Sequence, residues 1–147
     1  MRVDVLRGFA EVLNKLKKVV YNKIIAYICA KFKNMEIIKL TTKPQTLEAI
    51  KAGLLKEYTR EIRPNTQAKY CDLDEDGYVR EIDGVLQPRK YDVVQFACGH
   101  ETYTCKIEDE WIELFEDENH ELISYVENGE EYLKAQIVFR IGEKIVL

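Results

Sequence analysis

Residues 56–64, Lys-Glu-Tyr-Thr-Arg-Glu-Ile-Arg-Pro, constrain the fold more than any other segment. Their alternation is typical of a β-strand, and a period of two puts Tyr58 and Ile62 on one face together with Lys56 and Arg60. A hydrophobic core does not accept two unpaired cations, because burying an isolated charge is costly. This face is therefore either solvated, as an edge strand with ion pairs, or it lines a cleft for an anionic or carbonyl-rich ligand.

The charge is unevenly divided along the 147 residues. Residues 1–34 carry eight Lys or Arg against Asp4 and Glu11, a net charge of +6, whereas the remainder has a net charge of −10. An acidic body argues against broad binding to duplex nucleic acid, so we expect no partner that is a DNA duplex. The length suits one domain with a moderate core, which we place at residues 35–147, preceded by an extension of residues 1–34.

Apolar residues recur at helical spacing from Leu6 to Ile28, with lysines among them. This pattern predicts that residues 1–34 form one or two basic amphipathic helices. The longest apolar run, residues 19–30, contains polar interruptions and is too short to span a bilayer, so a membrane partner is not expected. Three alternatives stay open for this extension: attachment to an anionic membrane surface, a helix loosely docked on the rest of the protein, and a natural start at Met35 that leaves the extension with no partner of its own.

The rest of the chain reads as short strands with one clear helix. Pro44 opens that helix, Thr42 is a candidate N-cap, and Gly53 ends it. This order favours an α+β fold, a small and mostly antiparallel β-barrel with flanking helices, in addition to the N-terminal helical extension. The predicted strands are residues 36–41, 56–62, 78–82, 91–96, 102–107 and 136–146; residues 64–70 form a turn or short helix, and 111–115 are ambiguous.

Three pieces occur in a characteristic order: Leu-Glu-Ala-Ile-Lys-Ala-Gly at 47–53, the charged segment at 56–64, and Arg-Lys-Tyr-Asp-Val-Val-Gln-Phe at 89–96. With them, the chain from about Met35 to its end resembles the ASCH domain family of the PUA-like superfamily of small β-barrels. The resemblance implies a PUA-like barrel with a cleft beside the helix and the charged strand. It also implies a role in binding RNA or nucleotides.

We therefore predict that the domain binds RNA or a nucleotide- or nucleoside-like ligand in a charged cleft. Lys56 and Arg60 are suited to neutralise phosphate or hold carbonyl groups, and arginine favours bidentate contacts. A glutamate beside them can orient these cations or accept a hydrogen bond from the amino group of a base. The candidate ligand-binding residues are Lys56, Glu57, Tyr58, Arg60, Glu61 and Arg63, and the candidate stacking rings are Tyr58, Tyr91 and Tyr103.

Two other functions stay open. Some members of the resembled family are amidohydrolases that act on acetylated cytidine through a Lys, a Thr three residues later and a Glu, and Lys56 and Thr59 match this spacing. A lysine of depressed pKa can activate a hydroxyl nucleophile, but a regular strand points these two side chains to opposite faces, so a bulge is required. The other open function is a protein-interaction module, and whether any catalysis occurs is undecided. The glutamate is not fixed: Glu108, Glu110, Glu113 and Glu116 are candidates.

Metal binding and thiol chemistry have weaker support. Asp72, Asp74, Asp76 and Gly77 match the opening of a calcium loop, but the twelfth position is Asp83, where a bidentate Glu is usual. An acidic turn between strands is the simpler interpretation. The four cysteines are expected to be reduced thiols of a cytoplasmic protein. We expect no metal and no cofactor.

Overall fold

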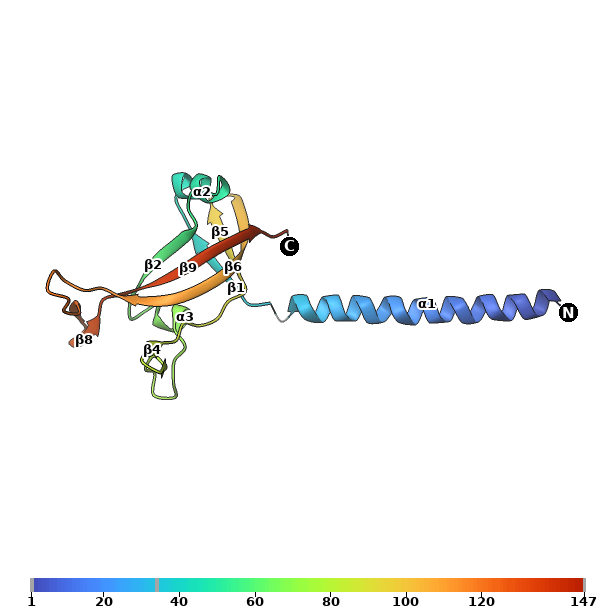
Figure 1. Ribbon diagram of the computed structural model, residues 1–147, viewed down its shortest axis with the longest axis horizontal. Helices are drawn as coiled ribbons and strands as arrows, with labels where there is room; N and C mark the ends of the chain where they lie inside the picture. The colour runs from blue at the N-terminus through green and yellow to red at the C-terminus, as the bar shows by residue number, and fades with distance from the viewer. Residues whose placement is uncertain (1, 34, 147) are drawn as a thin grey trace. The chain divides into compact units, whose positions relative to one another are not determined.

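The computed structural model describes residues 2–33 and 35–146, with side chains for residues 11–26 and 35–146. The chain forms two compact units, residues 1–35 and 36–147. The first unit holds α1 (Arg2–Lys33), one uninterrupted helix where the sequence predicted one or two (Figure 1). Among the described residues, no helix combines the length and the hydrophobicity that crossing a membrane requires.

The second unit, which we call the body, consists mostly of strands (Figure 1). Its elements are β1 (Ile37–Thr41), α2 (Pro44–Lys51), β2 (Glu57–Ile62), α3 (Gln67–Tyr70), β3 (Glu81–Ile82), β4 (Val85–Leu86), β5 (Val93–Cys98), β6 (Glu101–Leu114), β7 (Ser124–Glu127), β8 (Glu130–Leu133) and β9 (Ala135–Lys144).

Five strands form one sheet in the order β1-β5-β6-β9-β2, and this sheet curls into a half-barrel (Figure 1). The pair β1–β5 is parallel and the other three pairs are antiparallel. The expected mixed α and β fold, dominated by antiparallel strands, is confirmed at this level. The ambiguous residues around Trp111 belong to β6, which is long enough to pair with both β5 and β9.

The concave face of the sheet holds the core. Phe96, Ile137 and Phe139 are fully buried there, and the ring of Tyr58 meets Phe96 edge to face at 4.9 Å between centroids. Helix α2 closes this face with Leu47 and Ile50. Pro44 suits the first turn of α2 because its fixed φ and missing N–H cost nothing there. The N-cap is Lys43 without a side-chain hydrogen bond, so the predicted cap at Thr42 is wrong.

Two short hairpins extend from the sheet. Each turns on an Asp-Gly or Asn-Gly pair with positive φ: Asp83 and Gly84 join β3 to β4, and Asn128 and Gly129 join β7 to β8. These dipeptides favour tight turns because both residues tolerate left-handed backbone. The sequence interpretation placed one strand at 78–82, which the structure shortens to two residues, and missed the hairpin of β7 and β8 altogether.

Arg60 connects the two edges of the curled sheet. It lies on the concave side of β2, as alternation predicts, and its Nε donates to the Tyr58 hydroxyl at 2.9 Å. Its Nη2 donates to the backbone carbonyl of Thr41 at the end of β1, the opposite edge strand. The guanidinium is thus accommodated by neutral oxygen acceptors, which explains how a half-buried cation is tolerated beside the core.

Arg60→Ala is expected to destabilise the body by about 2 kcal/mol, because it removes the charge-assisted hydrogen bonds to the Tyr58 hydroxyl and the Thr41 carbonyl. Urea denaturation measures this change. Arg80→Ala is the matched control, since Arg80 is half exposed and meets Asp72 only at 3.6 Å, and it should cost less than about 1 kcal/mol. Equal effects in the two variants would contradict a bridging role for Arg60.

Candidate functional site

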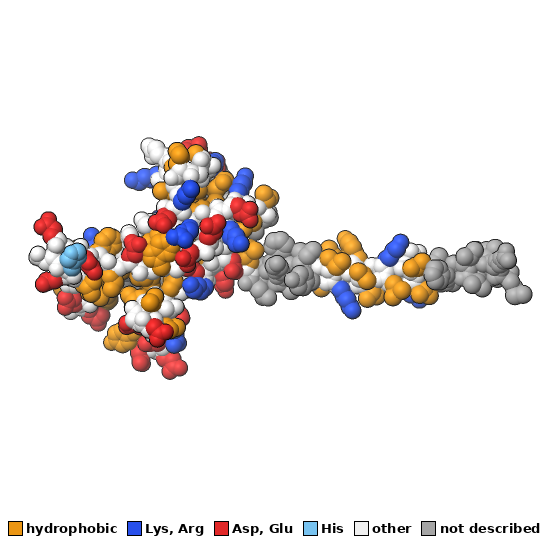
Figure 2. Space-filling model, viewed as in Figure 1, with side chains coloured by type: hydrophobic (Ala, Val, Ile, Leu, Met, Phe, Trp, Pro, Cys, Tyr) orange, Lys and Arg blue, Asp and Glu red, His pale blue; other side chains and the backbone are white. Residues whose placement is uncertain are grey.

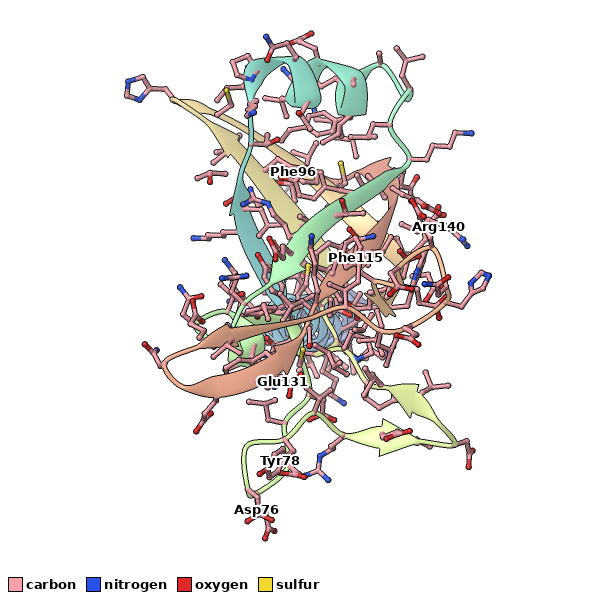
Figure 3. The ribbon with its side chains drawn as sticks, turned by 90° about the vertical axis from the view of Figure 1, so that its left-hand side faces the viewer. Asp76, Tyr78, Phe96, Phe115, Glu131 and Arg140 are labelled. Atoms are coloured by element: carbon pink, nitrogen blue, oxygen red, sulfur yellow. The ribbon has the colours of Figure 1, made fainter. Side chains whose placement is uncertain are left out.

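A cavity of about 800 Å³ lies at one end of the concave face. Its apolar floor comes from the ends of three strands: Ile62 of β2, Ile112 and Leu114 of β6, and Ala135 of β9. The loop of residues 76–79 supplies one wall, and the hairpin of β7 and β8 supplies another. Figure 3 shows Asp76 and Tyr78 on that loop, below the hairpin that carries Glu131. The volume is that of a small-molecule site.

Three tyrosines line this cavity. Tyr125 and Tyr132, directly opposite each other on β7 and β8, stack with centroids 5.9 Å apart and planes 27° apart. Tyr78 on the facing loop is 71% exposed, an unusual state for a large ring. Burial raises the pKa of Tyr125, and a hydrogen bond from Tyr132 to Glu130 at 2.8 Å raises the pKa of Tyr132. The rings of the stacked pair are therefore neutral phenols at physiological pH.

Charge in the cavity is mainly negative. Of the residues that line it, Arg63 is basic, whereas Asp76, Glu130 and Glu131 are acidic. The guanidinium of Arg63 lies 4.2 Å from the centre of the Tyr125 ring, a cation–π contact. This net charge disfavours a phosphate inside the cavity and favours a ring system with hydrogen-bond donors.

Acidic side chains also hold Arg63 from outside the cavity. Its guanidinium lies 3.3 Å from Glu61 and 3.4 Å from Glu127. Burial tends to lower the pKa of Arg63, but nearby acidic groups raise it overall, so the side chain is cationic. The two carboxylates hold the guanidinium against the Tyr125 ring.

Of the six predicted ligand-binding residues, Arg63 lines this cavity. Tyr58 is buried in the core, and the Arg60 guanidinium is engaged in the hydrogen bond to the Thr41 carbonyl at the opposite edge of the sheet. Lys56 is exposed immediately before β2. Four of the predicted residues thus form two separate hydrogen-bonded pairs, Arg60 with Tyr58 and Arg63 with Glu61, and not one shared cleft.

The remaining predicted residues lie on the convex face of the sheet. Glu57 is exposed and approaches Arg140 at 3.8 Å. Thr59 pairs with Val138, and the register of β2 on β9 runs without a shift from Glu57 to Ile62. Within β2, all of which is described, there is thus no bulge to turn Thr59 toward the face of Lys56.

Glu110 is the candidate glutamate with the most unusual surroundings. It is 6% exposed, and its Oε1 accepts a hydrogen bond from the backbone N–H of Tyr91 at 3.0 Å. Its Oε2 is buried and has no partner among the described residues. Burial raises the pKa of Glu110 above the usual range of a carboxyl group. Because Glu110 pairs with Phe139, which pairs with Tyr58, it belongs to the face opposite Thr59.

Glu110→Gln is expected to stabilise the body at neutral pH. Folding raises the pKa of this carboxyl, so the folded state loses stability as the pH rises from about 4 through the folded pKa. Each unit of pKa difference between the folded and unfolded states corresponds to about 1.4 kcal/mol. Glutamine removes this penalty and keeps the acceptor for Tyr91. Urea denaturation from acidic to neutral pH should show the advantage of the variant growing with pH and vanishing in acid.

Glu113→Gln is the matched control with the opposite sign. Hydrogen bonds from Trp111 and Gln136 lower the pKa of Glu113, so its ionised form supports the fold and the variant should lose stability at neutral pH. A loss of stability at neutral pH in both variants would show that Glu110 is needed as a carboxylate.

No model of a known protein family, no curated protein and no solved structure matches this chain. The resemblance to the ASCH domain family therefore stays a prediction. Within the described ranges, no three His, Cys, Asp or Glu side chains are grouped so that they could hold a metal ion. In the acidic loop, the Asp74 carboxylate accepts backbone N–H groups of Asp76 and Tyr78 instead. Cys71 is part of the cavity lining, and burial raises the pKa of its thiol to about 11, which keeps it protonated at neutral pH.

Proposed function

We propose that this protein binds a nucleoside-like ligand, free or as an unstacked base of RNA, in the cavity between Tyr78 and the hairpin of β7 and β8. The observation that carries the proposal is a volume of about 800 Å³ with a hydrophobic floor and three tyrosines on its walls. Unstacked bases are typically bound by stacking on aromatic rings and by hydrogen bonds to their edges.

Each kind of side chain in the cavity has a distinct role in this proposal. The tyrosine rings stack on the base, and Glu130 and Glu131 accept hydrogen bonds from its amino groups. Arg63 donates to a carbonyl oxygen of the base. Because the acidic groups outnumber Arg63 in the lining, the sugar and any phosphate point toward solvent. The protein thus recognises the base of the ligand, and a phosphate group on the ligand weakens binding.

We also propose that the body is a PUA-like barrel of the ASCH family. A curled sheet with α2 over its concave face is compatible with a PUA-like barrel, and residues 47–53, 56–64 and 89–96 resemble the ASCH family. Three of the cysteines, Cys71, Cys98 and Cys105, are free thiols. Unpaired thiols support a reducing compartment, so we include a cytoplasmic location.

A thermal-shift screen of the full chain against nucleosides, their 5′-phosphates and short single-stranded RNA tests the proposal. We expect nucleosides with amino groups to raise the melting temperature, and their triphosphates to do so less at equal concentration. Lys56→Ala is the control, because Lys56 is not among the residues that line the cavity, and it should respond as the natural chain does. No response to any of these ligands would contradict the proposal. Hydrolysis of acetylated cytidine that is lost in Lys56→Ala would support the amidohydrolase instead.

A further inference from the structure

Helix α1 presents an apolar stripe that the helix itself cannot bury. At 100° per residue, Val12, Leu13, Leu16, Val19, Val20 and Ile24 fall within an arc of about 140°. These six side chains are 41–57% exposed. Figure 2 shows hydrophobic side chains gathered along the described part of this helix, with lysines between them. The continuity of the helix matters, because a break would have divided the stripe into two faces.

Lysines lie at both borders of the stripe. By the same geometry, Lys17 follows the arc by about 20° on one side, and Lys15 precedes it by about 40° on the other. Lys23 falls inside the arc. Long lysine stems can lie along an apolar surface while their ammonium groups reach outward. An apolar face with basic borders is the pattern of helices that lie in the plane of a membrane interface.

The charge of this segment is one-sided. From residue 12 to residue 33 the sequence holds six lysines and no Asp or Glu. A second copy of the helix packed on the stripe would bring lysines against lysines, without the acidic partners that usually flank a coiled-coil seam. A lysine inside the arc would also fall within that seam. The arc is wider than the narrow seam that a coiled coil uses.

We propose that α1 binds the surface of a membrane that contains anionic lipids, with its stripe facing the acyl chains and its lysines at the headgroups. The sequence argued against a segment that spans a bilayer and left attachment to an anionic membrane surface open, and an interfacial helix needs no spanning segment. Charge complementarity selects the anionic lipid, because each lysine near such a surface favours binding and residues 12–33 hold six lysines and no acidic residue.

Co-sedimentation of the full chain with lipid vesicles tests this inference. We expect binding to phosphatidylcholine vesicles with about one third phosphatidylglycerol, at least about tenfold tighter than to pure phosphatidylcholine, and weakened at about 0.5 M salt. Equal partitioning into the two kinds of vesicle, or none into either, would overturn it.

Two variants with the same change of charge separate the stripe from the opposite face. Leu16→Glu should weaken vesicle binding by roughly fiftyfold or more, because it removes apolar burial and adds a negative charge. Asn14→Glu, on the opposite face, should weaken it only about fivefold. Similar losses in the two variants would overturn the role of the stripe. A solution oligomer that Leu16→Glu dissociates would assign the stripe to a second copy instead. Circular dichroism of both variants confirms that helix content is retained.

Discussion

Phe96→Ala should destabilise the body by about 3–5 kcal/mol, the largest effect that we expect from a single substitution. Phe96 lies in β5 (Figure 3) and is fully buried. Its ring meets that of Tyr58 edge to face, with 4.9 Å between the centroids. Alanine removes this contact and leaves a void between the sheet and α2 that close-packed neighbours fill only in part. Since domains of this size are stable by about 5–15 kcal/mol, a large fraction of the stability is lost.

The measurement is the free energy of unfolding from urea titrations of the natural chain and the variant. Phe115→Ala (Figure 3) is the matched control, because Phe115 is only half-buried. Its ring centre lies 5.0 Å from the ammonium nitrogen of Lys134. Its loss should be about 1 kcal/mol or less. A Phe96 variant as stable as the Phe115 variant would mean that the core is not centred on the concave face of the sheet.

Tyr125→Ala is expected to lower the affinity for a nucleoside by roughly 10- to 100-fold, the second large effect. Tyr125 stacks on Tyr132 and carries Arg63 on its ring, so its removal dismantles the aromatic wall of the cavity and releases the guanidinium. Isothermal titration with the nucleoside that gives the largest thermal shift measures this loss.

Two further tyrosine variants serve as controls for Tyr125→Ala. Tyr125→Phe keeps the ring and should retain the affinity within about twofold, since stacking does not need the hydroxyl. Tyr103→Ala removes a half-buried ring that packs beside Lys144. Because Tyr103 does not line the cavity, this variant should leave the affinity for the nucleoside unchanged. If Tyr125→Ala binds the nucleoside as well as the natural chain does, the ligand does not stack on this hairpin.

Much of the local structure could be predicted from residues alone. The apolar spacing gave the helix of residues 2–33, and Pro44 and Gly53 marked the limits of α2. Alternation placed Tyr58, Arg60 and Ile62 on one face of β2, as observed. These features depend on the backbone period and on the allowed φ of single residues, which are local properties.

The site was harder to predict. The charged segment indicated a cleft, but the cavity lies at the end of β2 and includes only Arg63 among the six predicted residues. Its aromatic wall was missed, although Asn128-Gly129 between two runs with tyrosines is a strong hairpin signal. The rings named from the sequence, Tyr58, Tyr91 and Tyr103, do not line the cavity.

The amino-acid sequence by itself determined where chain segments become helix or strand, and which side chains share a face, because both follow from the backbone period. Only the tertiary structure decided what those faces meet. It brought the Thr41 carbonyl to Arg60 and joined β1 to β5 in parallel. It also set Tyr78 across a cavity from Tyr132. Contacts between residues far apart in the chain depend on strand order and register, and these are fixed by the packing of the whole core.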